Sequence, residues 1–549
     1  MIKDGPMFNA YPDSCGGRLD DVVRLLGRRE LSGLFRYFYI LPSLFQSDLD
    51  RGFSVIAYEL DEELARRADL DALKKAGIEL KLDFVLNHLS AQSPQFLDLL
   101  QNGDGSTYVE FFIDWNRFWA GEGEPAEDGC IVPRQAHLDK LFMRKPGLPV
   151  AKVPFPDGSK RFYWNTFYQA WDGDRLLGQM DLNAESEDVW SFYEQTLEAL
   201  ASFGARIVRL DAFAYLHKEV GTANFLNEPG TWRYLDRIRK MADKRNLSLL
   251  PEIHAKHSDG VHRKLAGQGY PIYDFFFPAL MIHAIETGDV TALATWITEA
   301  ISEGYDLITM LGCHDGIPVL DVKGLLDDKE IDALIDIITS RGGRIKDLYG
   351  PDGKKVSYYQ VNATFFSALA EDAQKMLLAR AVQLFMPGVP QIWYLDLFAG
   401  TNDYKAADEG GHKEINRTDL SLEEIEERLQ LPVVKKQLEL LRFRAESPAF
   451  GVNGAARSFD RPGGGRQRPA GPDHPTVEPP VGDAGQGAAS DAAAPGDTRP
   501  ADATATVGLE TPGSHELVIT RAAAGHCARL TVNFRKLEYS IEEQGKSPS

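Results

Sequence analysis

Cysteine is scarce in this sequence, and the few cysteines lie far apart. Only Cys15, Cys130, Cys313 and Cys527 occur in 549 residues. They form no Cys-x-x-Cys pair, and no cluster of histidines stands beside them. This spacing indicates neither a disulfide framework nor a zinc site, so we expect reduced thiols.

Long hydrophobic runs are also missing. No stretch of about 18 residues is apolar and uncharged throughout. The first residues, MIKDGPMFNAYPDSCGG, have no apolar segment after a basic start. The sequence therefore predicts neither a membrane-spanning helix nor a signal peptide, and we expect a cytoplasmic protein.

Positive charge is in deficit. The chain has 60 Lys and Arg against 81 Asp and Glu, a formal net charge of −21. Such a chain has no basic field to attract a polyanion, so we expect neither nucleic acid nor a membrane as a partner. Hydrophobic residues at 43% and charged residues at 26% are typical of a globular protein, and small anions could still bind in a locally basic pocket.

Short apolar runs alternate with amphipathic segments from residue 34 to about residue 395. The runs begin at Leu34, Ile78, Ala205, Leu247, Tyr270, Asp306 and Pro390. Most lack strict alternation of apolar and polar residues, which is typical of parallel strands buried on both faces. The intervening segments show the apolar spacing of three and four that predicts helices. We therefore predict an α/β fold, and within it a (β/α)8 TIM barrel over a doubly wound sheet.

Two segments interrupt this alternation. We assign residues 1–88 and 157–440 to the barrel, with an inserted domain at 89–156 after the third barrel strand. A second, polar and Lys-rich insertion at 316–357 is predicted to act as a lid. Both follow the C-terminal end of a strand, the face where barrels build their active sites.

The chain changes in character after the barrel. Residues 451–513 contain almost no large apolar side chain and are predicted to be disordered, because they cannot bury enough surface to offset chain entropy. Residues 514–549 hold the β-rich runs HELVIT and ARLTVNF, which predict a small C-terminal β region.

Three acidic residues stand at the ends of three predicted strands: Asp211 in RIVRLDA, Glu252 in LLPEIH and Asp315 in LGCHDG. In a barrel such strand ends face one funnel. A pair of carboxylates there suits cleavage of a glycosidic bond, with one as nucleophile and one as proton donor. A single acidic residue at a strand end is more often a turn or cap residue, so the set carries the argument.

Basic and neutral donors flank these acids. Arg209 lies two positions before Asp211 and shares its face of the strand, so the guanidinium is expected to keep this carboxylate ionised. His88 in DFVLNH and His314 stand at strand ends and could bind sugar hydroxyls, although a lone histidine is often a structural hydrogen-bond donor. Enclosure among carboxylates is expected to raise the pKa of Glu252, as a general acid requires.

The four motifs DFVLNH, RIVRLDA, LLPEIH and LGCHDG resemble those of glycoside hydrolase family 13, the α-amylase clan, over roughly residues 6–450. DRGFSVIAY, KEVGTANF and HKEINR are similar to the sucrose phosphorylase subgroup of that family. The resemblance implies that Asp211 is the nucleophile, Glu252 the general acid and base, and Asp315 the transition-state stabiliser. It implies substrate contacts at Asp50, His88, Phe167, Arg209, Tyr215, His314, Gln360 and Arg417.

Basic residues near the expected acceptor side are Arg144, Lys145 and Lys413, and they resemble the cations of sucrose 6F-phosphate phosphorylases. A solvated basic turn is the alternative. The resemblance implies retaining phosphorolysis of sucrose 6F-phosphate to α-glucose 1-phosphate and fructose 6-phosphate through a covalent glucosyl-enzyme. It implies no cofactor and no metal, with inorganic phosphate as co-substrate.

Several other functions stay open from the sequence. The acceptor could be fructose, glycerate or glycerol, and a retaining α-glucosidase would use water in place of phosphate. A catalytically silent sugar-binding protein is a further alternative, which the presence of all three carboxylates disfavours.

Overall fold

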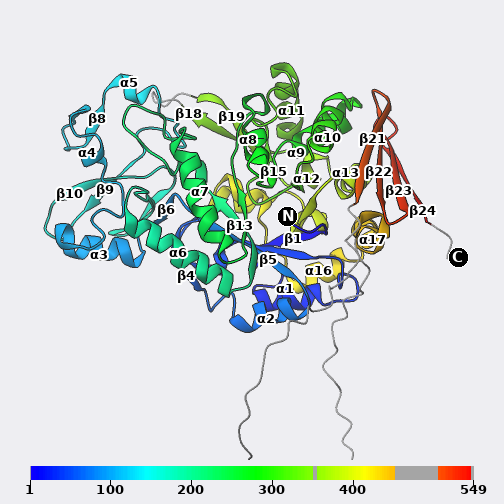
Figure 1. Cartoon of the computed structure of the whole chain (residues 1–549), viewed down its shortest axis with the longest axis horizontal. Coiled ribbons are helices and arrows are strands. Elements are labelled where there is room, and N and C mark those ends of the chain that lie inside the picture. The colour runs from blue at the N-terminus through cyan, green and yellow to red at the C-terminus, as the bar shows by residue number, and fades with distance from the viewer. Residues whose placement is uncertain (1, 350–354, 452–504, 546–549) are drawn as a thin grey trace, which may run out of the picture.

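The computed structural model describes residues 2–349, 355–451 and 505–545. At its centre is a parallel eight-stranded sheet with the order β14-β13-β5-β2-β1-β20-β16-β15. The two end strands, β14 and β15, also contact each other, so the sheet nearly closes. Helices surround it (Figure 1), which confirms the predicted (β/α)8 barrel.

The barrel strands follow the predicted apolar runs. They are β1 (Met7–Ala10), β2 (Tyr37–Ile40), β5 (Glu79–Val85), β13 (Ala205–Asp211), β14 (Ser248–Pro251), β15 (Ile272–Asp274), β16 (Leu307–Met310) and β20 (Val389–Trp393). Every residue of β1, β2, β16 and β20 is buried, as expected for strands covered on both faces. The sequence runs missed only β1, whose four residues are too few to stand out.

Amphipathic helices connect the strands. They are α1 (Leu19–Leu26), α2 (Arg67–Lys75), α6 (Glu187–Ser202), α7 (Gly230–Asp243), α8 (Val261–Gly267), α9 (Phe277–Thr287), α10 (Thr291–Ser302), α13 (Ala373–Phe385) and α17 (Pro432–Glu446). In α7 the buried positions Leu235, Ile238 and Ala242 are spaced by three and four, which turns one stripe of the helix toward the barrel. None of the described helices is long and apolar enough to cross a membrane.

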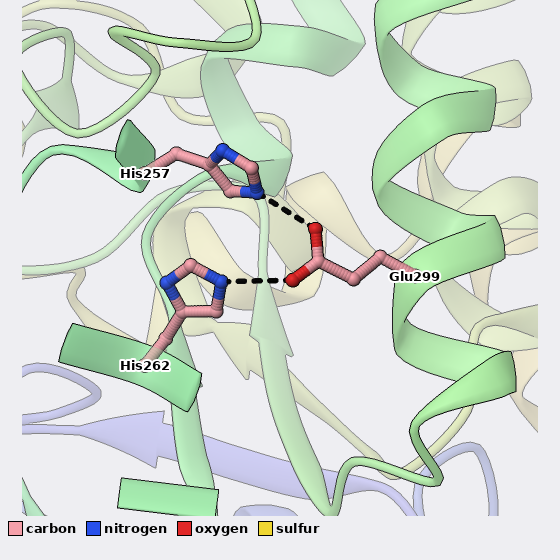
Figure 2. A group of neighbouring side chains, drawn as sticks. All are labelled: His257, His262 and Glu299. Atoms are coloured by element: carbon pink, nitrogen blue, oxygen red, sulfur yellow. Dashed lines mark hydrogen bonds and ion pairs between the residues drawn. The ribbon is translucent and has the colours of Figure 1, made fainter. Parts of the chain in front are cut away.

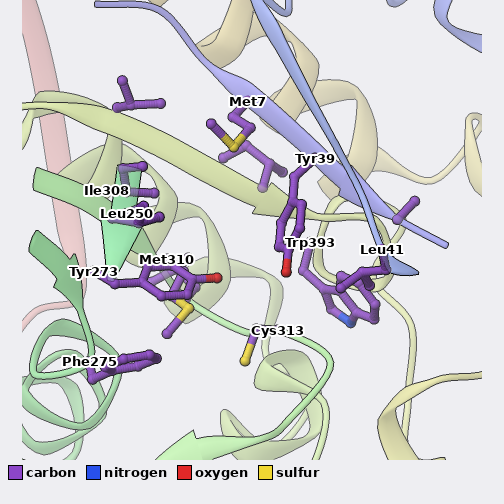
Figure 3. Close-up of a cluster of buried hydrophobic side chains, with 14 of the residues drawn as sticks. Met7, Tyr39, Leu41, Leu250, Tyr273, Phe275, Ile308, Met310, Cys313 and Trp393 are labelled. Atoms are coloured by element: carbon purple, nitrogen blue, oxygen red, sulfur yellow. The ribbon is translucent and has the colours of Figure 1, made fainter. Parts of the chain in front are cut away.

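The core is continuous through the barrel. Figure 3 shows side chains from β1, β2, β14, β15, β16 and β20 packed together, among them Met7, Tyr39, Tyr273 and Met310. One lysine is also enclosed: Nζ of Lys81 lies 3.8 Å from the ring centre of Tyr39 and donates to Gln391 at 2.7 Å, and burial lowers its pKa well below the usual value. Polar groups are therefore already present inside the barrel, where burial requires each of them to have a hydrogen-bond partner.

The first insertion lies between β5 and α6. Its elements are β6 (His88–Ser90), α3 (Pro94–Asn102), α4 (Trp115–Phe118), β7 (Gly123–Pro125), β8 (Ile131–Pro133), α5 (Gln135–Leu138), β9 (Val150–Pro154), β10 (Lys160–Trp164), β11 (Gln169–Asp172) and β12 (Arg175–Asp181). It has a small tryptophan-rich core of its own. The boundaries 89–156 stay a prediction, and the antiparallel strands of this segment continue to Asp181.

A buried ion pair joins this insertion to the barrel. The ammonium of Lys218 lies 2.8 Å from Oδ2 of Asp181 and donates to Asn87 and to the carbonyl of Tyr215 at 2.9 and 2.7 Å. Three oxygens therefore share one cation at a point where three separate chain segments meet.

The second insertion follows β16. It contains β17 (Ile317–Pro318), α11 (Asp328–Ser340), β18 (Arg344–Tyr349) and β19 (Lys355–Asn362), and β19 pairs with both other strands. That the segment 316–357 acts as a lid stays a prediction.

The remaining elements are β3 (Phe45–Ser47), β4 (Val55–Leu60), α12 (Phe365–Ala368), α14 (Tyr394–Leu397), α15 (Tyr404–Gly410) and α16 (Leu422–Arg428).

The C-terminal β region is an antiparallel sheet of β21 (Thr506–Gly513), β22 (Glu516–Ala523), β23 (His526–Asn533) and β24 (Glu538–Gln544), which lies beside α10, α13 and α17 (Figure 1). Disorder was predicted for 451–513, but its last part is β21. That part of the prediction is wrong, because pairing with β22 satisfies the backbone and Val507 and Leu509 pack against the core. Residues 452–504 lie outside the described residues.

Candidate active site

One pocket lies at the C-terminal ends of the barrel strands, and all three predicted catalytic carboxylates line it. Asp211 ends β13, Glu252 directly follows β14, and Asp315 follows β16. Seven of the predicted binding residues line the same pocket: Asp50, His88, Arg144, Phe167, Tyr215, His314 and Lys413. The sequence motifs and the barrel geometry thus converge on one site.

Arg209 connects the carboxylates from beneath. Its Nη1 donates to Asp211 at 2.8 Å and to Asp83 at 2.6 Å, and its Nη2 lies 3.3 Å from Oε1 of Glu252. Asp83 also accepts a hydrogen bond from Tyr39 at 2.8 Å. The guanidinium is buried and does not line the pocket, so its contact is with the carboxylates. The expected pairing of Arg209 with Asp211 is present, but the expectation that it keeps this carboxylate ionised is wrong, because burial raises the pKa of Asp211 more than Arg209 lowers it.

The two reacting carboxylates differ in their affinity for a proton. Burial raises the pKa of Asp211 to about 8 against the opposing charge of Arg209, with the Glu252 carboxylate adding to the rise. Burial also raises the pKa of Glu252, but Arg209 and the hydrogen bond from His254 outweigh it and bring the value to about 2. The raised pKa expected for Glu252 is therefore found on Asp211. Near neutral pH the pair carries one proton.

His254 supports Glu252 from the other side. Its Nε2 lies 3.3 Å from Oε1 of Glu252, and its Nδ1 lies 3.2 Å from Oδ1 of Asp321. The ring stacks on Phe275 with centroids 3.8 Å apart. Burial lowers the pKa of His254, but Asp321 and Glu252 raise it to about 9. The imidazole is thus held cationic against the proposed general acid.

Asp315 lies among cations and a histidine. His314 Nε2 approaches Oδ2 of Asp315 at 3.2 Å, and Lys413 Nζ approaches Oδ1 at 3.1 Å. Although burial raises the pKa of Asp315, His314 and Lys413 bring it well below its usual range. Asp315 is therefore ionised, as a transition-state stabiliser must be.

A second ion-pair group closes the same side of the pocket. Asp50 lies 3.3 Å from both Lys413 Nζ and Arg417 Nη1. Arg417 is buried behind the lining residues and donates from Nε to the carbonyl of His314 at 2.8 Å. Gln360 also lies behind the lining and donates to the carbonyl of Asp315 at 2.5 Å. These contacts fix the backbone that carries His314 and Asp315.

Aromatic side chains form the remaining wall. Phe53 stacks on His314 with centroids 5.0 Å apart, and its carbonyl lies 3.0 Å from Nε2 of His88. Phe167 packs at 5.2 Å from both His88 and Tyr215. Burial lowers the pKa of His88 to about 4, so this imidazole is neutral and can hydrogen-bond a hydroxyl group.

The three cations predicted for the acceptor side have different surroundings in the structure. Arg144 lines the pocket with its guanidinium 4.2 Å from the ring centre of Tyr359. Its neighbour Lys145 points away, hydrogen-bonds Asn165 and does not line the pocket. Lys413 lines the pocket but is paired with Asp50 and Asp315.

Lys346 is a lining lysine that the sequence did not reveal. It lies in β18, and its ammonium is 5.8 Å from the ring centre of Tyr359, the ring that also contacts Arg144. Among the described residues, no carboxylate forms an ion pair with Lys346 or Arg144. The only sign of Lys346 in the sequence was that the insertion is rich in lysine. The pocket is also lined by residues that the sequence analysis did not predict, among them Phe53, Phe142, Tyr168, Gln179, Phe225, His254, Leu320 and Tyr359.

The chain is similar to known phosphorylases. It is 59% identical over 457 residues to a sucrose 6(F)-phosphate phosphorylase from Ilumatobacter coccineus, covering 81% of this chain and 87% of that one. It is 35% identical over 460 residues to a sucrose phosphorylase from Streptococcus mutans, covering 82% and 90%. The chain belongs to the sucrose phosphorylase group of glycoside hydrolase family 13.

Solved structures agree with this family. The sucrose 6F-phosphate phosphorylase from Thermoanaerobacter thermosaccharolyticum superposes with a TM-score of 0.81 at 29% identity, covering 100% of this chain and 96% of that one. An α-amylase from H. orenii superposes with a TM-score of 0.59 at 15% identity, covering 97% and 90%, a likeness of fold alone. No family model matches the chain.

Proposed function

We propose that this enzyme phosphorolyses sucrose 6F-phosphate with retention, forming α-glucose 1-phosphate and fructose 6-phosphate. The observation that carries the choice of substrate is Arg144, a half-buried cation on the pocket wall, with the amine of Lys346 near the same tyrosine ring. Burial, with the charges of Lys413 and Arg144, lowers the pKa of Lys346 well below its usual value, so an anionic ligand is needed there to hold its proton. An enclosed cation that has no carboxylate partner among the described residues calls for such a ligand. A substrate phosphate is such a ligand, and the Ilumatobacter coccineus relative carries this name at 59% identity.

The proposed first step is glucosyl transfer to the enzyme. A carboxylate oxygen of Asp211 attacks the anomeric carbon, and the bond from that carbon to the fructosyl oxygen breaks. Glu252 donates its proton to the departing oxygen, which leaves as fructose 6-phosphate. The pKa values place the single proton of the pair on Asp211, so this step needs it to move to Glu252 once the donor is bound, which leaves Asp211 ionised for the attack. Asp315, ionised, stabilises the positive charge that develops on the sugar.

The proposed second step releases the glucosyl group. An oxygen of inorganic phosphate attacks the anomeric carbon, the ester bond to Asp211 breaks, and Glu252 takes up the proton from phosphate. Two inversions at one carbon give net retention, so the product is α-glucose 1-phosphate. Phosphate is therefore a co-substrate, and we propose that no other cofactor is needed.

We also propose a cytoplasmic location. The four cysteines are unpaired, which suits the reducing conditions of that compartment.

The deciding experiment compares donors and acceptors. The enzyme is incubated with sucrose 6F-phosphate and with sucrose, each with and without inorganic phosphate, and glucose 1-phosphate and free glucose are assayed. The proposal requires phosphate-dependent glucose 1-phosphate, formed faster from the phosphorylated donor. Faster turnover of sucrose would make the enzyme a sucrose phosphorylase, and release of glucose without phosphate would make it a glucosidase. Glucosylglycerate and glucosylglycerol serve as the third and fourth donors.

A further inference from the structure

A cluster of two histidines and one glutamate lies outside the catalytic pocket. His257 is in the short helix η5 (His257–Asp259), His262 is in α8, and Glu299 is in α10. Figure 2 shows both rings directed at one carboxylate, with His257 Nε2 at 2.8 Å from Oε2 and His262 Nε2 at 3.0 Å from Oε1. Across the described residues, this is the one group of three such donors whose ligand atoms all lie within 4.8 Å of one another.

The donor set has the chemistry of a zinc-type ligand set. Two imidazole nitrogens and one carboxylate oxygen bind Zn²⁺ and Co²⁺ at about 2.0 to 2.2 Å, with water in the fourth position. Ligand atoms around a tetrahedral ion at that distance are about 3.4 Å apart. The two imidazole nitrogens lie 2.8 and 3.0 Å from different oxygens of Glu299, and the ligand atoms all lie within 4.8 Å of one another, so small side-chain shifts would make room for an ion between them.

Arg263 holds the outer side of the same carboxylate. Its Nε and Nη2 lie 2.8 and 2.9 Å from the two oxygens of Glu299, and Tyr305 donates to Oε1 at 3.1 Å. The Arg263 side chain is 49% exposed, whereas Glu299 is 15% exposed. Arg263 and Tyr305 also line a cleft that opens at this edge of the molecule. A cation arriving through the cleft therefore meets Arg263 and Tyr305 first, and has one exposed competitor to displace before it contacts Glu299.

We propose that His257, His262 and Glu299 bind one divalent transition metal ion of the zinc class, in competition with the guanidinium of Arg263. The site is separate from catalysis, since none of the three residues lines the substrate pocket. It does face the catalytic loop: the His257 N–H donates to the carbonyl of Asp321 at 2.8 Å, and the Asp321 carboxylate contacts His254. The bound ion clamps the segment after β14 onto α10.

The test uses the full-length enzyme and Co²⁺, whose visible absorption reports ligand number and geometry. At pH 7.5, where ordinary imidazoles are neutral, we expect one Co²⁺ per chain with bands of a tetrahedral or five-coordinate ion, displaced by Zn²⁺. His262→Ala and Glu299→Gln should each weaken Co²⁺ binding at least about tenfold. Their rate of sucrose 6F-phosphate turnover shows whether the variants are folded.

Arg263→Ala distinguishes this site from a structural ion-pair cluster. Loss of the competing guanidinium should tighten Co²⁺ binding by several-fold. His137→Ala is the matched control and should leave Co²⁺ affinity unchanged. His137 pairs with a carboxylate, Glu122, at 2.9 Å, but in the part of the chain that the structure describes no second histidine completes a three-residue group with it. The proposal is overturned by absence of saturable binding at about millimolar Co²⁺, by unchanged affinity in both ligand variants, or by weaker binding in Arg263→Ala.

Discussion

The ammonium of Lys413 lies 3.1 Å from Oδ1 of Asp315, the carboxylate proposed to stabilise the transition state. The same ammonium lies 3.3 Å from Asp50. From the sequence, Lys413 was expected to hold the phosphate of the fructosyl unit. Its two carboxylate partners now favour a role on the glucosyl side, where it positions Asp50 and Asp315.

Lys413→Met should therefore reduce turnover of sucrose and of sucrose 6F-phosphate by similar factors. Removal of one partner from a buried ion pair leaves a carboxylate uncompensated, so the loss should reach about a hundredfold or more in kcat/KM. Steady-state kinetics with both donors measures this. A loss confined to the phosphorylated donor would instead restore Lys413 to the phosphate site.

Asp211→Asn should remove nearly all turnover while the protein stays folded, because an amide of the same shape cannot attack the anomeric carbon. The expected loss is several powers of ten in kcat. Unfolding in urea checks the fold, since the change also replaces the carboxylate that pairs with Arg209 by a neutral amide. Retention of more than about a tenth of the activity would mean that another group is the nucleophile.

The fold could be predicted because seven of the eight barrel strands are apolar runs long enough to be seen, and because strand ends in a barrel must converge. The four motifs at those ends therefore located the carboxylates. The acceptor side was harder. Arg144 and Lys145 are adjacent and chemically alike, and only the local loop decides which one faces the pocket.

Lys346 could not be placed from the sequence because its position depends on the pairing of β18 with β19, a contact between strands of one insertion. His254 was visible in LLPEIH, but its partner Asp321 lies 67 residues later. The strand β21 was missed for a related reason. The residues of β21 are mostly exposed, and they form a strand because β21 pairs with β22, a contact that the sequence of β21 alone does not reveal.

Glu252→Gln should affect donors according to their need for a proton. Sucrose 6F-phosphate has a poor leaving group, so loss of the acid should cost about two to four powers of ten. Glucosyl fluoride needs little proton assistance and should lose much less in the step that forms the glucosyl-enzyme. Single-turnover rates with both donors make this comparison. Equal losses would remove the acid role from Glu252.

Arg144→Ala and Lys346→Met should each cost roughly ten- to a hundredfold in kcat/KM toward sucrose 6F-phosphate, as expected for a charged hydrogen bond to phosphate. The rate with sucrose should change little, so the preference ratio shrinks. Lys145→Met is the matched control, because its ammonium is turned toward Asn165, and it should preserve the ratio. If wild-type enzyme prefers sucrose, or if Arg144→Ala lowers both rates equally, the phosphate site lies elsewhere.

His254 should make stability depend on pH. Asp321 and Glu252 face its ring and raise its pKa to about 9, against an ordinary value of 6.5. A histidine whose pKa is higher in the folded state stabilises the fold fully below about pH 6.5, and this contribution is lost as the pH rises through about 9. Urea midpoints of the wild type should therefore fall between pH 6.5 and 9 more steeply than those of His254→Asn, which keeps hydrogen-bonding groups but cannot gain a proton. Parallel curves for the two proteins would show that His254 is not the group that holds this charge.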